Sequence, residues 1–121
     1  MDQDALVSEI RALKDRVDGI TDSTVATVDG MLVASDIDHV SAEGFAALAA
    51  AMLGVAQRTV QELGDGVFRE TVTRSDSGYV AVYAVGDQTL LAVLADPNLN
   101  LARLRLEARQ AIGRLAVILS K

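Results

Sequence analysis

Cysteine is absent from the chain, and histidine occurs only once, at His39. The lack of cysteine excludes a disulfide framework, a thiol nucleophile and a cysteine-based zinc site, and one imidazole excludes a histidine-rich metal centre. Aromatic residues make up only 3% of the sequence, so stacking of nucleic-acid bases on aromatic side chains is not expected. Several common kinds of binding site are therefore excluded by composition alone.

Positive charge and long apolar runs are also scarce. The formal net charge is −6 at pH 7, which disfavours nucleic acid and anionic membranes as partners because phosphates need a positive surface. The longest uncharged stretch of the apolar region, Gly44 to Gln57, is too short to cross a bilayer. The acidic, polar N-terminal segment differs from a secretory signal. We therefore expect a soluble cytoplasmic protein with no membrane span.

Apolar side chains, in contrast, are plentiful, at 50% of the 121 residues. This length and composition predict one domain, residues 1–121, with a substantial core. Apolar periodicity predicts helices over residues 5–17, over 41–63 and from the Asp96-Pro97-Asn98 turn to the C-terminus, and strands over 24–28, 31–35, 67–74, 79–85 and 89–95. Asp29-Gly30 predicts a type I′ hairpin turn, and Ser41 is the expected N-cap of the second helix.

Two of the predicted strands, 79–85 and 89–95, are apolar on both faces. An antiparallel sheet with one wet face would alternate apolar and polar residues, so these strands should be central and covered on both sides. Residues 67–74 are rich in charge and threonine, which is typical of an edge strand. The sequence therefore predicts a three-layer α/β/α sandwich around a five-stranded antiparallel sheet, with the order α-ββ-α-βββ-α.

The second predicted helix has no polar side chain from Gly44 to Ala56. One face, including Phe45, Leu48 and Leu63, should pack on the sheet, while small residues on the opposite face would admit a second backbone closely. Alanine is also harmless on a surface, but a continuous apolar patch favours self-association through a two-fold axis. Pairing of two edge strands would extend the sheet, unless Arg69, Glu70 and Arg74 prevent such pairing. The expected interface residues are Ala46, Ala47, Ala50, Ala51, Gly54, Arg58, Gln61, Val67, Arg69, Thr71 and Thr73.

The D-x-D spacing of Asp36 and Asp38 after an apolar run matches the nucleophile motif of haloacid-dehalogenase phosphatases. That chemistry also needs a downstream lysine, further carboxylates for Mg²⁺ and a parallel βαβ core, whereas the only lysines are Lys14 and the terminal Lys121. We therefore interpret the pair as part of an acidic connector. A Ca²⁺ loop lacks the required oxygen ligands, and Ser35 with His39 are only loop neighbours. No GxxxxGK[ST] phosphate loop is present.

The last predicted helix carries arginines at 103, 105, 109 and 114 with a single glutamate, Glu107. Arg103, Glu107, Gln110 and Arg114 are expected on its solvent face, and Leu104, Ala108, Ala111 and Leu115 are expected to pack inward. A basic stripe of this kind could bind an acidic partner, although it is more often a solvated face. None of these groups predicts a catalytic, metal or cofactor site.

Three segments, in their order along the chain, resemble the roadblock/LC7 domains and particularly the bacterial members. Residues 24–35, TVATVDGMLVAS, resemble the family's first two strands around an Asp-Gly turn. Residues 41–53, SAEGFAALAAAML, resemble its small-residue central helix, and residues 96–112, DPNLNLARLRLEARQAI, are similar to its last-helix segment. The resemblance covers essentially the whole chain and rests on the order and spacing of these segments.

This resemblance implies a profilin/longin-like fold and a homodimer with its central helices side by side and a continuous sheet. It implies a non-catalytic regulator that binds a small Ras-like GTPase, in a signalling set with a sensor-kinase-like protein and without a cofactor. Ala47, Ala50, Ala51, Gly54 and Arg58 match the family's dimer helix. The alternative function is a small-ligand sensory module, for which the central strands offer few polar residues: Tyr79, Tyr83 and Thr89.

Overall fold

Helices and strands follow one another in the predicted order α-ββ-α-βββ-α. The computed structural model describes residues 2–64 and 66–121. The elements are α1 (Gln3–Arg16), β1 (Ile20–Thr27), β2 (Leu32–Asp36), α2 (Ala42–Leu63), β3 (Thr71–Ser75), β4 (Gly78–Val85), β5 (Thr89–Ala95) and α3 (Leu101–Leu119). The strands form one antiparallel sheet with the spatial order β2-β1-β5-β4-β3. β5 lies at the centre of the sheet with β4 beside it, and these two are the strands predicted to be central.

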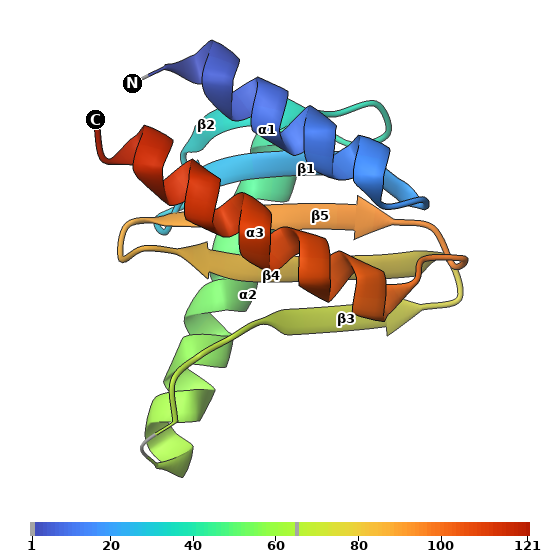
Figure 1. Ribbon diagram of the computed structural model, residues 1–121. Coiled ribbons are helices and arrows are strands. Elements are labelled where there is room, and N and C mark those ends of the chain that lie inside the picture. The colour runs from blue at the N-terminus through green and yellow to red at the C-terminus, as the bar shows by residue number, and fades with distance from the viewer. Residues whose placement is uncertain (1, 65) are drawn as a thin grey trace.

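Helices cover both faces of this sheet, which confirms the three-layer prediction. α1 and α3 lie on one face and α2 crosses the other (Figure 1). Alternate residues of β4 point to opposite faces of the sheet. Ala81, Tyr83 and Val85 belong to the core under α1 and α3, and Val82 belongs to the core under α2. A strand that is buried on both faces has no position for a solvated side chain, and this explains its apolar composition.

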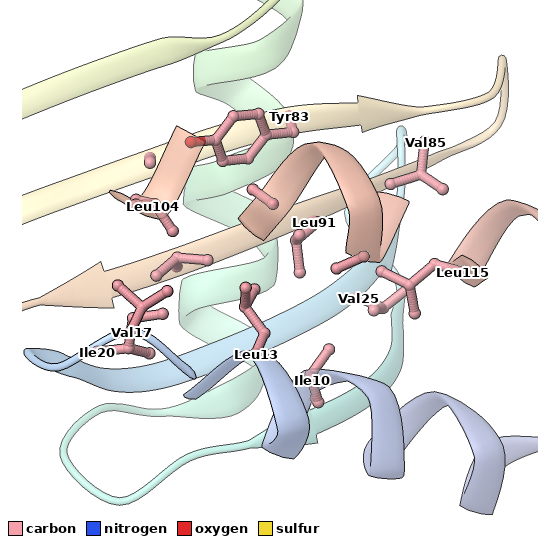
Figure 2. Packing of buried hydrophobic residues seen from close by; sticks show 14 of the residues in the cluster. Ile10, Leu13, Val17, Ile20, Val25, Tyr83, Val85, Leu91, Leu104 and Leu115 are labelled. Carbon is pink, nitrogen blue, oxygen red and sulfur yellow. The ribbon is translucent and has the colours of Figure 1, made fainter. Parts of the chain in front are cut away.

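The larger core lies between the sheet and the pair α1 and α3. Figure 2 shows Leu13 of α1 and Leu115 of α3 pointing toward Val25 and Leu91 of the sheet. All four of these side chains are fully buried. Burial of one leucine or valine side chain of this kind contributes about 1.5–3 kcal/mol, so helical spacing of apolar residues is sufficient to hold both helices on the sheet.

β1 begins at Ile20 rather than at residue 24. Its early polar residues Asp22, Ser23 and Thr24 are buried and pair with β5. The Thr24 hydroxyl donates to the carbonyl oxygen of Ala34, at 3.1 Å. The sequence pattern failed here because the buried Asp22 and Thr24 side chains make hydrogen bonds, which periodicity does not reveal.

The hairpin between β1 and β2 exists, but its turn differs from the predicted type I′. A type I′ turn needs positive φ at both central residues, whereas among the described residues only glycines have positive φ, with Gly30 at +94°. The Gly30 N–H donates to the Thr27 carbonyl at 2.9 Å, and the Thr27 N–H donates to Met31 at 2.8 Å. The connection is thus a three-residue loop that ends in a left-handed glycine.

Candidate functional site

The second half of α2 extends beyond the β3 edge of the sheet (Figure 1). The buried residues of this helix are Phe45, Ala46, Ala49 and Leu53, and none follows Leu53. In the second half the side chains of Val55 and Leu63 are 70% and 84% exposed. The described part of the chain leaves these apolar side chains largely uncovered, so this overhang is a candidate interaction surface.

An apolar groove lies between this overhang and β3. It has a volume of about 610 Å³ and is lined by Ala51, Met52, Val55, Ala56, Thr59, Val60, Phe68, Glu70, Thr71 and Thr73. We call it the α2–β3 groove. Ala51, Thr71 and Thr73 among these residues were predicted to be interface residues. Two predicted features, the small-residue helix and the edge strand, therefore meet in one groove.

The structure rotates α2 relative to the predicted packing. Ala46 was expected at an interface but is fully buried against the sheet, while Leu48 was expected on the sheet and is 66% exposed. The inner layer contains the small residues Ala26 and Ala92 together with Ala46, so the helix approaches the strands closely there without a leucine. Of the other predicted helix residues, Ala50 is partly buried, and the following are exposed or half-exposed: Ala47, Ala51, Gly54, Arg58 and Gln61.

β3 is an edge strand, as predicted, because it pairs only with β4. It begins at Thr71, however, and not at residue 67. Val67 and Arg69 are exposed and precede the strand, and Glu70 turns toward α3, where its carboxylate lies 2.7 Å from Arg105 Nη2. The Glu70–Arg105 ion pair thus joins this segment to α3, where the residue pattern predicted a strand.

A second cavity lies on the α3 side of the same segment. Its volume is about 680 Å³ and its lining residues are Phe68, Arg69, Glu70, Tyr83, Ala84, Arg105, Arg109 and Ile112. We call it the arginine cavity. The sequence pattern placed Arg105 and Arg109 on a basic stripe and Arg69 in the edge strand, but did not bring them together with Tyr83. Such a grouping depends on the path of residues 67–70, which no local pattern indicates.

Tyr83 contributes a buried hydroxyl to the arginine cavity. The residue is only 5% exposed, and its hydroxyl oxygen has no hydrogen-bond partner among the residues that the structure describes. Burial raises the pKa of Tyr83 well above its ordinary value, the charge of Glu70 acts in the same direction, and Arg105 opposes them. The phenol is therefore a neutral hydrogen-bond donor at physiological pH.

The remainder of α3 differs from the predicted solvent stripe. Leu104, Ala108, Ala111 and Leu115 pack inward as predicted. Glu107, however, is only 8% exposed and lies 3.5 Å from Arg103, while Arg114 lies 2.8 Å from Glu9 of α1. Arg114 thus connects α3 to α1, Arg105 pairs with Glu70, and among the described residues Arg109 has no carboxylate within ion-pair distance.

The acidic connector that contains Asp36 and Asp38 is organised by a buried carboxylate, Asp22. Its Oδ2 accepts the backbone N–H groups of Asp38 and His39, each at 2.8 Å, and its Oδ1 lies 2.9 Å from His39 Nδ1. Burial alone would raise the pKa of Asp22, but the hydrogen bonds from His39, Asp38 and Thr21 hold it below its ordinary value. Asp22 thus fixes the chain where it approaches α2. Sequence analysis missed this role.

Asp36 and Asp38 themselves pair with α1. Lys14 Nζ lies 3.9 Å from Asp36 and 3.4 Å from Asp38, and Arg11 lies 3.8 Å from Asp36. Within residues 2–64 and 66–121 no group of three or more His, Cys, Asp or Glu side chains is arranged to hold a metal ion. The D-x-D spacing therefore serves as a charged connection between the connector and α1. Over the same part of the chain, no helix combines the length and the hydrophobicity that a bilayer crossing requires.

The element order, the layers and the strand order together define a profilin-like α/β/α sandwich. The family model of the Roadblock/LC7 domain matches residues 6–95. An uncharacterized protein of Methanocaldococcus jannaschii is 32% identical over 101 residues, which cover 83% of this chain and 88% of that protein. The chain belongs to the Roadblock/LC7 domain family, as its resemblance predicted.

Solved structures agree with this assignment. A Roadblock/LC7 domain from Streptomyces avermitilis is 29% identical and has a TM-score of 0.89, with 100% of both chains covered. MglB with a tetrameric arrangement is 19% identical with a TM-score of 0.87, over 96% of this chain and 88% of that one. Profilin II of Acanthamoeba castellanii is 12% identical with a TM-score of 0.58, over 81% and 86%. The last two show the fold alone, and they confirm the profilin-like class.

Proposed function

We propose that residues 1–121 form one roadblock/LC7 domain that acts as a non-catalytic, cytoplasmic homodimer and regulates a small Ras-like GTPase. The observation that carries this proposal is the apolar overhang of α2 beside the unpaired edge of β3. Each feature alone is a liability in a monomer, because one invites aggregation and the other invites strand pairing. A second copy related by a two-fold axis covers both features at once.

Small side chains support close contact between two copies of α2. Ala47, Ala51 and Gly54 leave the outer side of the helix without bulky groups, and a Cβ atom built on Gly54 meets nothing within 4 Å in the single chain. The exposed side chains of Leu48 and Val55 flank this strip. Two such surfaces can interlock with the large side chains of one copy beside the small side chains of the other.

Three charged residues could prevent pairing of two edge strands: Arg69 precedes β3, and Glu70 and Arg74 have partners in their own chain. Glu70 is held by Arg105 through two contacts, at 2.7 Å and 2.9 Å. The Arg74 guanidinium lies 5.6 Å from the centre of the Tyr79 ring. Both charged side chains thus have partners in their own chain, and Thr71 and Thr73 are left to face a second strand, a residue type that is well suited to cross-strand pairs.

The GTPase is the partner class that membership of the roadblock/LC7 family suggests, and a sensor-kinase-like protein is the second. A two-fold dimer of this domain presents two α2 helices as one continuous surface, which is large enough for a globular partner. Cytoplasmic location fits both partners. On this proposal the chain contributes a binding surface and no catalytic group of its own.

Affinity capture from the native host tests the GTPase proposal. Extracts loaded with GDP or with a non-hydrolysable GTP analogue are passed over immobilised wild-type protein, Gly54→Glu and the matched control Gly113→Glu. Gly113 is an exposed glycine of α3 whose added Cβ likewise meets nothing within 4 Å. We expect a Ras-like GTPase with wild type and Gly113→Glu, in amounts that depend on the nucleotide, and little with Gly54→Glu.

The recovered GTPase is then purified and its hydrolysis and nucleotide exchange are measured with and without the wild-type dimer. A change in either rate supports regulation. Capture that yields no GTPase in either nucleotide state, or equal GTPase recovery with Gly54→Glu and wild type, contradicts the proposed surface.

A further inference from the structure

The arginine cavity is a concentration of positive charge on an acidic protein. Arg69, Arg105 and Arg109 line it, and among the described residues Glu70 is the only carboxylate in its lining, whereas the whole chain has a net charge of −6. Glu70 is engaged by Arg105. Among the described residues, no carboxylate lies within ion-pair distance of Arg69 or Arg109. A cavity with excess guanidinium groups attracts and orients anions.

Tyr83 lines this cavity, and its buried hydroxyl has no hydrogen-bond partner among the described residues. Nearly all buried hydroxyls in folded proteins have a hydrogen-bond partner, because an unmade bond there is costly. Solvent does not reach this oxygen in the free protein, so an acceptor reaches it when a neighbouring side chain moves. Arg105, whose side chain is 50% exposed and whose charge acts on Tyr83, is the neighbour that would move, and an incoming anion would then replace Glu70 as its partner.

The remaining walls are apolar. Phe68, Ile112 and the Tyr83 ring face the same space as the guanidinium groups. A volume of about 680 Å³ falls within the range of sites for small organic ligands, which combine apolar walls with a few polar groups. Lone inorganic anions would leave the apolar walls uncovered, and a neutral apolar molecule would leave the arginines unused.

We propose that the arginine cavity binds a small organic anion, with a carboxylate or phosphate group against Arg105, Arg109 and Tyr83 and an apolar body against Phe68 and Ile112. This site adjoins the predicted dimer surface, because Arg69 lines the cavity and is also one of the predicted interface residues. Phe68 and Glu70 line both this cavity and the α2–β3 groove, so the ligand would contact the wall shared with that groove.

Titration of the wild-type protein with chosen probes tests the site. Phenyl phosphate and benzoate carry the two head groups on one apolar body, inorganic phosphate lacks the body, and phenol lacks the charge. Binding is followed by calorimetry and by amide chemical shifts. We expect saturable binding of phenyl phosphate or benzoate, whichever head group fits, with shifts in residues 68–70, β4 and α3. Inorganic phosphate and phenol should bind at least about tenfold more weakly.

Variants then assign the contacts. Arg109→Gln should weaken the better probe by about tenfold or more, as expected for loss of one charge-assisted hydrogen bond. Tyr83→Phe should weaken it by a smaller factor and keep the native circular dichroism spectrum. Arg11→Gln removes an exposed arginine of α1 outside the cavity and should leave the affinity unchanged.

Two results would overturn the proposal. One is the absence of saturable binding of either anionic probe to the wild-type protein at millimolar concentrations. The other is equal affinity for wild type, Arg109→Gln and Arg11→Gln. Neither result affects the proposed GTPase regulator, because that function is read from oligomeric mass and partner capture.

Discussion

α2 and α3 cover opposite faces of one sheet, and their inner sides are alike while their outer sides differ. Leu53 of α2 and Leu115 of α3 are both buried against the strands. On the outer side, α2 carries no charge from Gly44 to Gln57, whereas α3 carries arginine or glutamate at intervals from residue 103 to 114. Leu106 and Val117 are exposed on α3, but single apolar residues between charges are normal on a surface.

The two sides of an amphipathic or apolar helix can therefore serve different purposes, one in folding and one in association. The inward stripe of either helix is required for the fold and is satisfied within the chain. An apolar outer side with no charges must also be buried, and this requires a binding partner outside the chain. The comparison therefore predicts where mutations affect folding and where they affect association.

The largest expected effects come from the inner sides, where the two helices should behave alike. Leu53→Ala and Leu115→Ala each remove a fully buried side chain and should lower the free energy of unfolding by about 2–5 kcal/mol. Urea denaturation followed by circular dichroism measures both. A loss below about 1 kcal/mol for either variant would mean that its helix does not pack as described.

The next largest effects concern the segments that lead into the two helices, where the two stability losses should differ. Asp22→Asn removes a buried charge that accepts two N–H groups before α2, and should cost about 1.5–3 kcal/mol at pH 7. Asn100→Ala removes the exposed N-cap of α3, whose side chain accepts the Arg103 N–H, and should cost about 1 kcal/mol. Equal losses would contradict the organising role of Asp22.

The Asp22 effect also has a defined pH dependence. The folded pKa of Asp22 lies below its ordinary value of 3.8, so its ionised form stabilises the fold above that pH, and this contribution is lost as pH falls through the folded pKa. The stability difference between wild type and Asp22→Asn should therefore shrink on acidification below about pH 4. Unfolding curves at pH 7 and in acid measure it, and a difference that grows on acidification would contradict this sign.

The two exposed helix glycines give a smaller and sharper comparison. Alanine is better than glycine in a helix interior by about 1 kcal/mol, and neither Gly54 nor Gly113 has a neighbour that obstructs a Cβ. Gly113→Ala should stabilise the protein by this amount at every protein concentration. Gly54→Ala should do so only in dilute solution, since a methyl group at a close helix contact weakens the dimer. Denaturation at several concentrations tests this, and identical behaviour would place Gly54 outside the contact.

The smallest expected effect belongs to the polar end of the overhang. Arg58 and Glu62 form an exposed i,i+4 pair at 2.9 Å, and Glu62→Gln should cost only about 0.2–0.5 kcal/mol. Chemical denaturation of the variant in low salt measures this loss. A loss above about 1 kcal/mol would indicate that Glu62 contacts a second copy.

Hydrophobic periodicity sufficed to predict the layers, the element order, the central strands and the edge position of β3. It could not predict the rotation of α2, because Ala46 and Leu48 are both apolar and only contact with the sheet decides between them. It also missed Asp22 and the arginine cavity, which assemble from segments far apart in the sequence. The sequence pattern assigned Tyr83 only to one face of a strand. The structure places its side chain in the same cavity lining as Arg105 and Glu70, which gives its hydroxyl the proposed binding role.

The central claim is that the uncharged outer side of α2 is covered by a second copy of the chain. Light scattering coupled to size exclusion, at micromolar concentration, measures the mass of wild type, Gly54→Glu and Gly113→Glu. We predict twice the chain mass of 12.8 kDa for wild type and Gly113→Glu, and monomer or aggregate for Gly54→Glu. A monomeric wild type, or a Gly54→Glu variant that remains a dimer, would contradict the account.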